Sequence, residues 1–171
     1  TEIGSTSTGT RTYGVTWSPD GRFIAVINRN DYTLQIFRFK GMSNPILVGS
    51  TNIGNYLSAI SWSPDGKFIA VTNSGSATLQ IYKFTGAGNP TSVGSISTLS
   101  VNYSAKWSPD GRFISVVTAA NRLYIFRFTG SGNPILVNYT GTNSGTSNAV
   151  WSPFANFIAV VNATSNDLQI F

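Results

Sequence analysis

The chain has 171 residues and a formal net charge of +5; only 10% of its residues are charged, while 41% are apolar and 13% aromatic. This length and apolar content fit a single domain with a sizeable core and argue against a disordered chain. The sequence contains no cysteine and no histidine, which excludes disulfides, thiolate metal sites and imidazole-based catalysis. No apolar run approaches the roughly 20 residues of a membrane helix.

The pentapeptide Trp-Ser-Pro-Asp-Gly begins at Trp17 and returns at Trp62 and Trp107, and a degenerate copy begins at Trp151. The intervals between these tryptophans are 45, 45 and 44 residues. A period of this size, in a chain rich in β-formers and glycine turns, indicates one structural unit repeated four times.

Each unit contains four short apolar segments separated by turn residues. In the first unit these segments lie at residues 14–17, 23–27, 34–39 and 46–50. Runs of four to six residues rich in Val, Ile, Phe, Tyr and Trp predict β-strands, and no stretch has a sustained helical period. Several strands are apolar on both faces, as expected for sheets that lie between two neighbours.

The Ser-Pro-Asp-Gly segment predicts a tight turn between the first two strands, because proline fixes φ and glycine tolerates the left-handed region. We interpret its aspartate as a turn residue that accepts backbone N–H bonds, and the tryptophan before it as packing between units rather than as a sugar-stacking platform. These structural repeat positions are Trp17, Asp20 and Gly21; Trp62, Asp65 and Gly66; Trp107, Asp110 and Gly111; and Trp151.

Four-stranded sheets repeated about every 45 residues predict an all-β propeller of four blades. We expect one domain over residues 1–171, with blades at 13–50, 57–95, 102–139 and 146–171. The segments 17–26 and 62–71 resemble the WD40-like repeat of TolB-type propellers, and 71–82 also resembles the repeats of YVTN surface proteins and lactonase-like proteins. The resemblance covers essentially the whole chain and implies the fold without implying one activity.

The two ends of the chain predict how the propeller closes. Residues 3–5 align with 48–50 and 93–95, so the chain opens with a lone fourth strand and stops within the third strand of its last unit. We therefore predict Velcro closure, in which residues 1–5 pair with 167–171 and complete the last blade. Closure in cis gives a four-bladed monomer; closure in trans gives an eight-bladed homodimer, which we favour because eight blades need only about 45° between neighbours.

The acidic residues offer little for catalysis, since three of the six occupy the same turn. Lactonase-type chemistry, which the resemblance brings to mind, needs histidine and acidic groups that have no counterpart here. We therefore expect no enzymatic activity, no catalytic residue, no cofactor and no metal site. The basic residues recur once per unit instead of forming one stripe, which does not favour nucleic-acid binding.

The loops before the first strand of each unit and between its second and third strands diverge in sequence, so this end is the candidate binding face. Its Tyr and Arg residues are the types favoured at contact hot spots, although ordinary solvated loops explain them equally well. The candidates are Arg11, Arg29, Tyr32, Tyr56, Tyr103 and Arg122.

Two functions remain open. The first is a structural or protein-interaction scaffold, including an amplified or engineered array that assembles with itself. The second is a small-ligand or glycan-binding propeller with sites in the loops of one face. One site per blade would require the same polar and aromatic set in all four loops; the loops do not repeat in that way, which favours the scaffold. The protein or glycan partner itself stays open.

Overall fold

The computed structural model describes all 171 residues and consists of fifteen β-strands without a helix, so the predicted all-β class is confirmed. It therefore has no helix that could cross a membrane. The strands form four antiparallel sheets. The sheets are β1 (Thr12–Trp17), β2 (Phe23–Asn28), β3 (Thr33–Arg38) and β4 (Ile46–Asn52); β5 (Leu57–Trp62), β6 (Phe68–Asn73), β7 (Thr78–Lys83) and β8 (Thr91–Ser97); β9 (Asn102–Trp107), β10 (Phe113–Thr118), β11 (Arg122–Arg127) and β12 (Ile135–Gly141); and β13 (Thr146–Trp151), β14 (Ile158–Asn162) and β15 (Asp167–Ile170).

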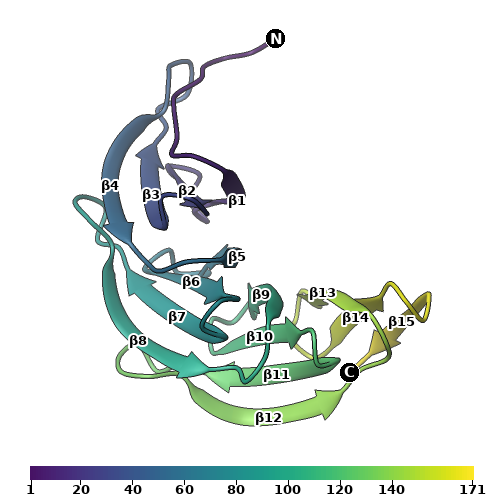
Figure 1. Cartoon of the computed structure of the whole chain (residues 1–171). Helices are drawn as coiled ribbons and strands as arrows, with labels where there is room; N and C mark the ends of the chain where they lie inside the picture. The colour runs from purple at the N-terminus through teal and green to yellow at the C-terminus, as the bar shows by residue number, and fades with distance from the viewer.

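The four sheets stand next to one another along an open arc (Figure 1). Within each sheet the strands follow chain order, so the first strand lies on the inner side of the arc and the fourth on its outer rim. The last sheet has three strands, and its β15 has β14 as its only neighbour. The order of strands and the side-by-side sheets are those of propeller blades.

The core lies between the sheets rather than inside any one of them. One buried cluster joins the first and second sheets and includes Phe23, Leu34 and Trp62. A second cluster joins the second and third sheets, and a third joins the third and fourth. Strands β6 and β10 lie in sheets that have a neighbour on each face, which explains why their sequences are apolar without alternation.

The Ser-Pro-Asp-Gly turn links the first two strands of the sheets. In the first sheet the amide of Gly21 donates to the carbonyl of Ser18, and the Ser18 hydroxyl accepts from the amide of Phe23 at 2.9 Å. The last copy, in which we expected the least regular hairpin, keeps the turn bond from Ala155 to Ser152 at 3.0 Å. Its irregularity lies in the backbone, because Ala155 has φ +58 where the other copies have glycine.

Closure in cis is not present in the single chain. Residues 1–9 form no strand, and β15 pairs with β14 alone. The N-terminal segment instead extends from the first sheet at one end of the arc, far from the fourth sheet at the other end (Figure 1). Closure in trans stays a prediction.

Candidate functional site

Each contact between neighbouring sheets joins two different faces. We call the face that carries the tryptophan of the first strand the front face, and the opposite one the back face. The back face of the first sheet meets the front face of the second, where the rings of Phe23 and Phe84 lie 5.1 Å apart, edge to face. Trp62 packs on the same Phe84 ring at 6.0 Å. Since the units repeat, every internal junction uses the same pair of faces.

The front face of the first sheet has no sheet against it. Trp17 is 51% exposed, whereas the equivalent Trp62 is 6% exposed. Trp107 is likewise buried and Trp151 half-buried. The tryptophans therefore pack between units at the internal junctions, as we interpret from the sequence. Trp17 differs because no sheet lies against the front face of the first sheet. Val15 beside it is exposed too, although its equivalent Ile60 is buried.

The back face of the fourth sheet is uncovered in the same way. Leu168 is 62% exposed and Ile170 is similarly open, whereas the equivalent Leu34 and Ile36 in the first sheet are fully buried. Phe157 is exposed as well. Exposed apolar faces of this kind mark interaction surfaces on soluble proteins. The two ends of the arc are therefore an uncovered front face and an uncovered back face. These are the same two kinds of face that pack together at each internal junction.

The N-terminal segment already occupies the position of an outer strand. In three places a serine amide of an outer segment donates to an asparagine side chain in the loop of the next sheet. The pairs are Ser5 to Asn44 at 3.1 Å, Ser50 to Asn89 at 3.0 Å and Ser95 to Asn133 at 3.0 Å. Ser50 and Ser95 lie in β4 and β8, so residues around Ser5 sit against the first sheet as β4 sits against the second.

The junction of the third and fourth sheets departs from this pattern at Asn138. The amide of Tyr139 donates to the side chain of Asn138, its own neighbour, at 2.9 Å. Asn138 stands where β4 and β8 have Gly49 and Gly94. A Cβ at Gly94 would collide with the carbonyl oxygen of Gly132 in the next loop. Asn138 therefore does not fit against a loop of the kind that follows β7 and β11.

An apolar cavity of about 470 Å³ opens beside this junction. It lies between β11 and β12 of the third sheet and the inner strands of the fourth. Its walls include Leu123, Tyr139, Trp151, Phe157 and Phe171. Phe157 is one of the lining residues and is 58% exposed.

A second candidate region is one end of the sheets, which we call the loop face. It carries the loops that precede the first strand of each sheet and the loops that join its second and third strands. The structure places Arg11, Arg29, Tyr32 and Tyr56 in these loops, close to the first two sheets. Two further candidates lie on the third sheet and not in loops. They are Tyr103, within β9, and Arg122, the first residue of β11.

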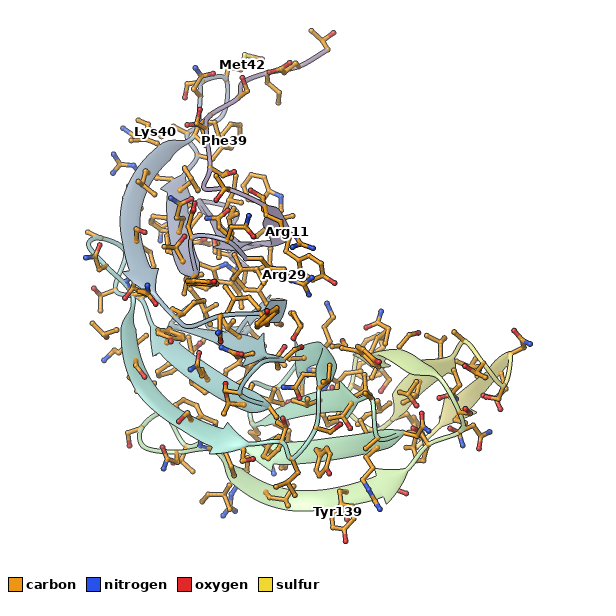
Figure 2. The ribbon with its side chains drawn as sticks, viewed as in Figure 1. Arg11, Arg29, Phe39, Lys40, Met42 and Tyr139 are labelled. Carbon is orange, nitrogen blue, oxygen red and sulfur yellow. The ribbon has the colours of Figure 1, made fainter.

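Arg29 makes three contacts on the loop face. Its amide donates to the carbonyl of Arg11 at 3.0 Å, so the two arginines lie side by side on the inner side of the first sheet (Figure 2). Its Nε donates to the carbonyl of Leu57 in the second sheet at 2.6 Å. Its guanidinium carbon lies 3.3 Å from the ring centre of Tyr13, a cation–π arrangement. The loop sequences do not point to Tyr13, because it lies within β1.

Each of the five aspartates accepts a hydrogen bond from a residue in a turn, in a loop or at a strand end. The Ser18 hydroxyl, followed by the backbone and side chain of Arg22, lowers the pKa of Asp20 to about 2. Hydrogen bonds from Thr10 lower the pKa of Asp31, and bonds from Asn143 and Asn162 lower that of Asp167. A depressed pKa makes these carboxylates poor general bases at neutral pH.

Comparison with known proteins identifies the family of the fold. The model of the family described as eukaryotic translation initiation factor eIF2A matches residues 3–133, more than half of the chain. No curated protein matches the sequence.

Solved structures with the same fold come from several kinds of propeller. A proposed 6-phosphogluconolactonase from Bacteroides uniformis superposes with a TM-score of 0.84 at 18% identity, over 98% of this chain and 54% of that one. A chain of the mitotic checkpoint complex gives 0.80 at 17%, over 98% and 52%. The periplasmic gluconolactonase PpgL of Pseudomonas aeruginosa gives 0.76 at 20%, over 94% and 49%. The chain thus spans about half the length of these propellers, and at such identities the likeness concerns the fold alone.

Proposed function

The chain belongs to the family described as eukaryotic translation initiation factor eIF2A, a family of WD40-like propellers, and we propose that it is a non-enzymatic scaffold that binds other proteins. The observation that carries the proposal is the division of the molecule into constant strands and divergent loops. The strands and turns repeat, whereas Arg and Tyr residues differ from sheet to sheet on the loop face. Repeat proteins present such surfaces to partners.

The state of the acidic groups supports a non-enzymatic role. Each aspartate is engaged by hydrogen bonds from its own turn or from the adjoining loop. Without histidine or cysteine, the chain has no side chain that titrates near neutral pH to serve as a base or nucleophile. Lactone hydrolysis, named for two of the similar structures, is therefore the activity to test.

The test is a pH-stat assay of glucono-δ-lactone and 6-phosphogluconolactone with the purified chain. We expect the rate of hydrolysis to equal that of buffer. Acceleration that disappears in Arg29→Gln would show that the loop face is an active site and would overturn the scaffold proposal. Acceleration that Arg29→Gln leaves unchanged points to a contaminant, which a second, independent purification identifies.

The ring is the second part of the proposal: two chains close head to tail into an eight-bladed propeller. The exposed back face around Leu168 and Ile170 matches the buried back face around Leu34 and Ile36. The exposed front face around Trp17 matches the one around Trp62. Docking each back face on the front face of the other chain would reproduce the internal junction twice. A head-to-tail contact that closes after two copies is a cyclic dimer.

Strand exchange in trans follows from the same geometry. Ser5 lies against Asn44 as Ser50 lies against Asn89, and Ser50 pairs with Gln35 across β3 and β4. By equivalence Ser5 of one chain would lie opposite Gln169 of the other. The substitution at Asn138 supports an outer strand that arrives without the usual loop, as a segment from a separate chain does.

Cysteine cross-linking tests the register, because the chain has no cysteine of its own. Ser5→Cys combined with Gln169→Cys should form a disulfide between chains and give a covalent dimer on a non-reducing gel. Ser5→Cys with Gln35→Cys is the matched control, because Gln35 already faces Ser50. A disulfide within one chain would show that the propeller closes in cis and would reject the dimer. The absence of any disulfide would reject strand exchange.

A further inference from the structure

Three bulky residues of the loop face adopt a backbone conformation that suits glycine. Arg11, Tyr32 and Tyr56 have φ values of +54, +57 and +55. In the left-handed region the Cβ crowds the backbone, so side chains other than Gly, Asn and Asp are disfavoured there. At these three positions the residue type does not suit the backbone conformation.

Three of the equivalent positions in the third and fourth sheets carry residues that the conformation favours. Gly145 occupies the place of Arg11 and Tyr56, with φ +79. Asn121 and Asn166 occupy the place of Tyr32, with φ +53 and +54. In the second sheet Ala77 holds φ +49 at the place of Tyr32, and in the loop before the third sheet Leu99 holds φ +62. Arg and Tyr adopt this conformation in the first two sheets alone.

Burial does not compensate for this strain. The Tyr56 side chain is 65% exposed, Tyr32 is exposed and Arg11 is exposed. Residues with a strained backbone cluster at ligand-binding and active sites, and here the strained side chains are not buried. The Arg and Tyr among these strained residues lie in the first two sheets, beside their junction.

Arg29 supplies a fixed charge at that junction. Its Nε is bound to Leu57 and its plane lies over Tyr13, so the direction of the guanidinium is set while its two terminal nitrogens remain uncommitted. A guanidinium held in this way presents a fork for a carboxylate. Arg11 next to it has no acidic partner within 4.0 Å. The acid nearby in the sequence, Asp31, accepts hydrogen bonds from Thr10.

We propose that these residues form a docking site for an acidic protein segment; we call Arg11, Tyr13, Arg29, Tyr32 and Tyr56 the Tyr–Arg patch. A carboxylate of the segment binds the terminal nitrogens of Arg29, Arg11 attracts a second one, and the tyrosines pack against the segment on either side. This inference rests on the proposed scaffold function and names its partner by chemistry.

The extent of the patch favours a peptide over a small sugar acid. The carbonyl of Tyr32 accepts from Ile53 at 2.8 Å, which joins the first sheet to the loop that carries Tyr56. Arg29 crosses to Leu57. The patch therefore continues from one sheet to the next, and an extended chain with spaced carboxylates can contact all of it.

Fluorescence anisotropy with a labelled peptide of alternating Glu and Gly tests the proposal, with an alternating Lys–Gly peptide as control. We expect the acidic peptide alone to bind. Arg29→Lys, which keeps the charge but loses the fork, should weaken binding about tenfold, and Arg11→Gln should weaken it as well. Arg127→Gln, an exposed arginine at the opposite end of the third sheet, should change it less than about twofold.

A second measurement separates docking from a structural role. Tyr56→Gly and Tyr32→Asn relieve the left-handed strain, so they should raise the melting temperature by about 2 to 4 °C while weakening peptide binding. Failure of the acidic peptide to bind, an equal loss in Arg127→Gln, or full binding by both tyrosine variants would overturn the Tyr–Arg patch. Gluconate that competes with the peptide mole for mole would overturn the choice of partner.

The scaffold proposal has its own tests, so the two can fail separately. If the peptide does not bind while lactone hydrolysis stays at the rate of buffer and the ring forms, the scaffold stands and its partner binds elsewhere. If lactone hydrolysis depends on Arg29, the scaffold itself falls.

Discussion

The backbone amide of Ser5 donates a 3.1 Å hydrogen bond to the side-chain oxygen of Asn44, thirty-nine residues away. The same bond ties Ser50 to Asn89 and Ser95 to Asn133. A segment without strand structure of its own is thus held in the register of an outer strand. The bond places Ser5 against the first sheet in the way that Ser50 lies against the second.

Removal of one of these bonds should weaken the contact between sheets. Asn89→Ala leaves the amide of Ser50 without its side-chain partner, and we expect the free energy of unfolding to fall by about 1 kcal/mol. Urea denaturation followed by tryptophan fluorescence measures the change. Asn138→Ala is the control, since its bond stays within one exposed strand, and it should cost less. Equal costs would mean that the bond between sheets adds nothing.

A charge on the exposed back face of the fourth sheet should break the proposed ring. Leu168→Glu and Ile170→Glu place a carboxylate where the equivalent leucine and isoleucine are buried, and a buried unpaired charge is costly. Light scattering should therefore report twice 18.3 kDa for the unmodified chain and 18.3 kDa for the variants. Ile46→Glu, on the outer rim in β4, should leave the mass unchanged. An unmodified chain of 18.3 kDa would reject the dimer.

Acid should weaken the first hairpin through Asp20. The folded pKa is about 2, below the ordinary value of 3.8, so the carboxylate stabilises the fold above pH 3.8 and loses this contribution as the pH falls toward 2. Because the group is near the surface, the effect should stay below about 1 kcal/mol. Asp20→Asn should flatten the dependence of unfolding free energy on pH between 4 and 2. The exposed Glu2→Gln is the control, and equal slopes in all three proteins would contradict the assignment.

The degenerate turn of the fourth sheet can be improved. Ala155 holds φ +58 while Gly21, Gly66 and Gly111 hold about +70 at the same position. Ala155→Gly removes this strain, and we expect a gain of about 0.5 to 1 kcal/mol in unfolding free energy. Gly66→Ala introduces the same strain in the second sheet and should lower stability. Thermal unfolding of both variants decides the point, and a loss of stability in Ala155→Gly would show that the alanine methyl packs usefully.

The repeat made the fold predictable from residues that are close in sequence. Trp62, Asp65 and Gly66 identify a strand end and a turn, and their spacing from Trp17 and Trp107 identifies the sheet as one of several. The candidate site was harder to predict. Arg29 could be named as an exposed loop residue, but its contacts with Tyr13 and Leu57 join two sheets and depend on how the sheets stack. Tyr103 and Arg122 were assigned to loops because strand ends cannot be read closely from sequence.

Local patterns of apolar residues, proline and glycine are enough to predict the all-β repeat, its period and its turns. Which copies of a repeated residue are buried depends on how the sheets stack, since Trp17 and Trp62 are equivalent in sequence but only Trp62 has a sheet against it. The tertiary structure also shows that Arg11, Tyr32 and Tyr56 adopt the unfavourable left-handed backbone conformation. Burial and backbone conformation are set by the neighbours that stacking provides, and those neighbours lie far apart along the chain.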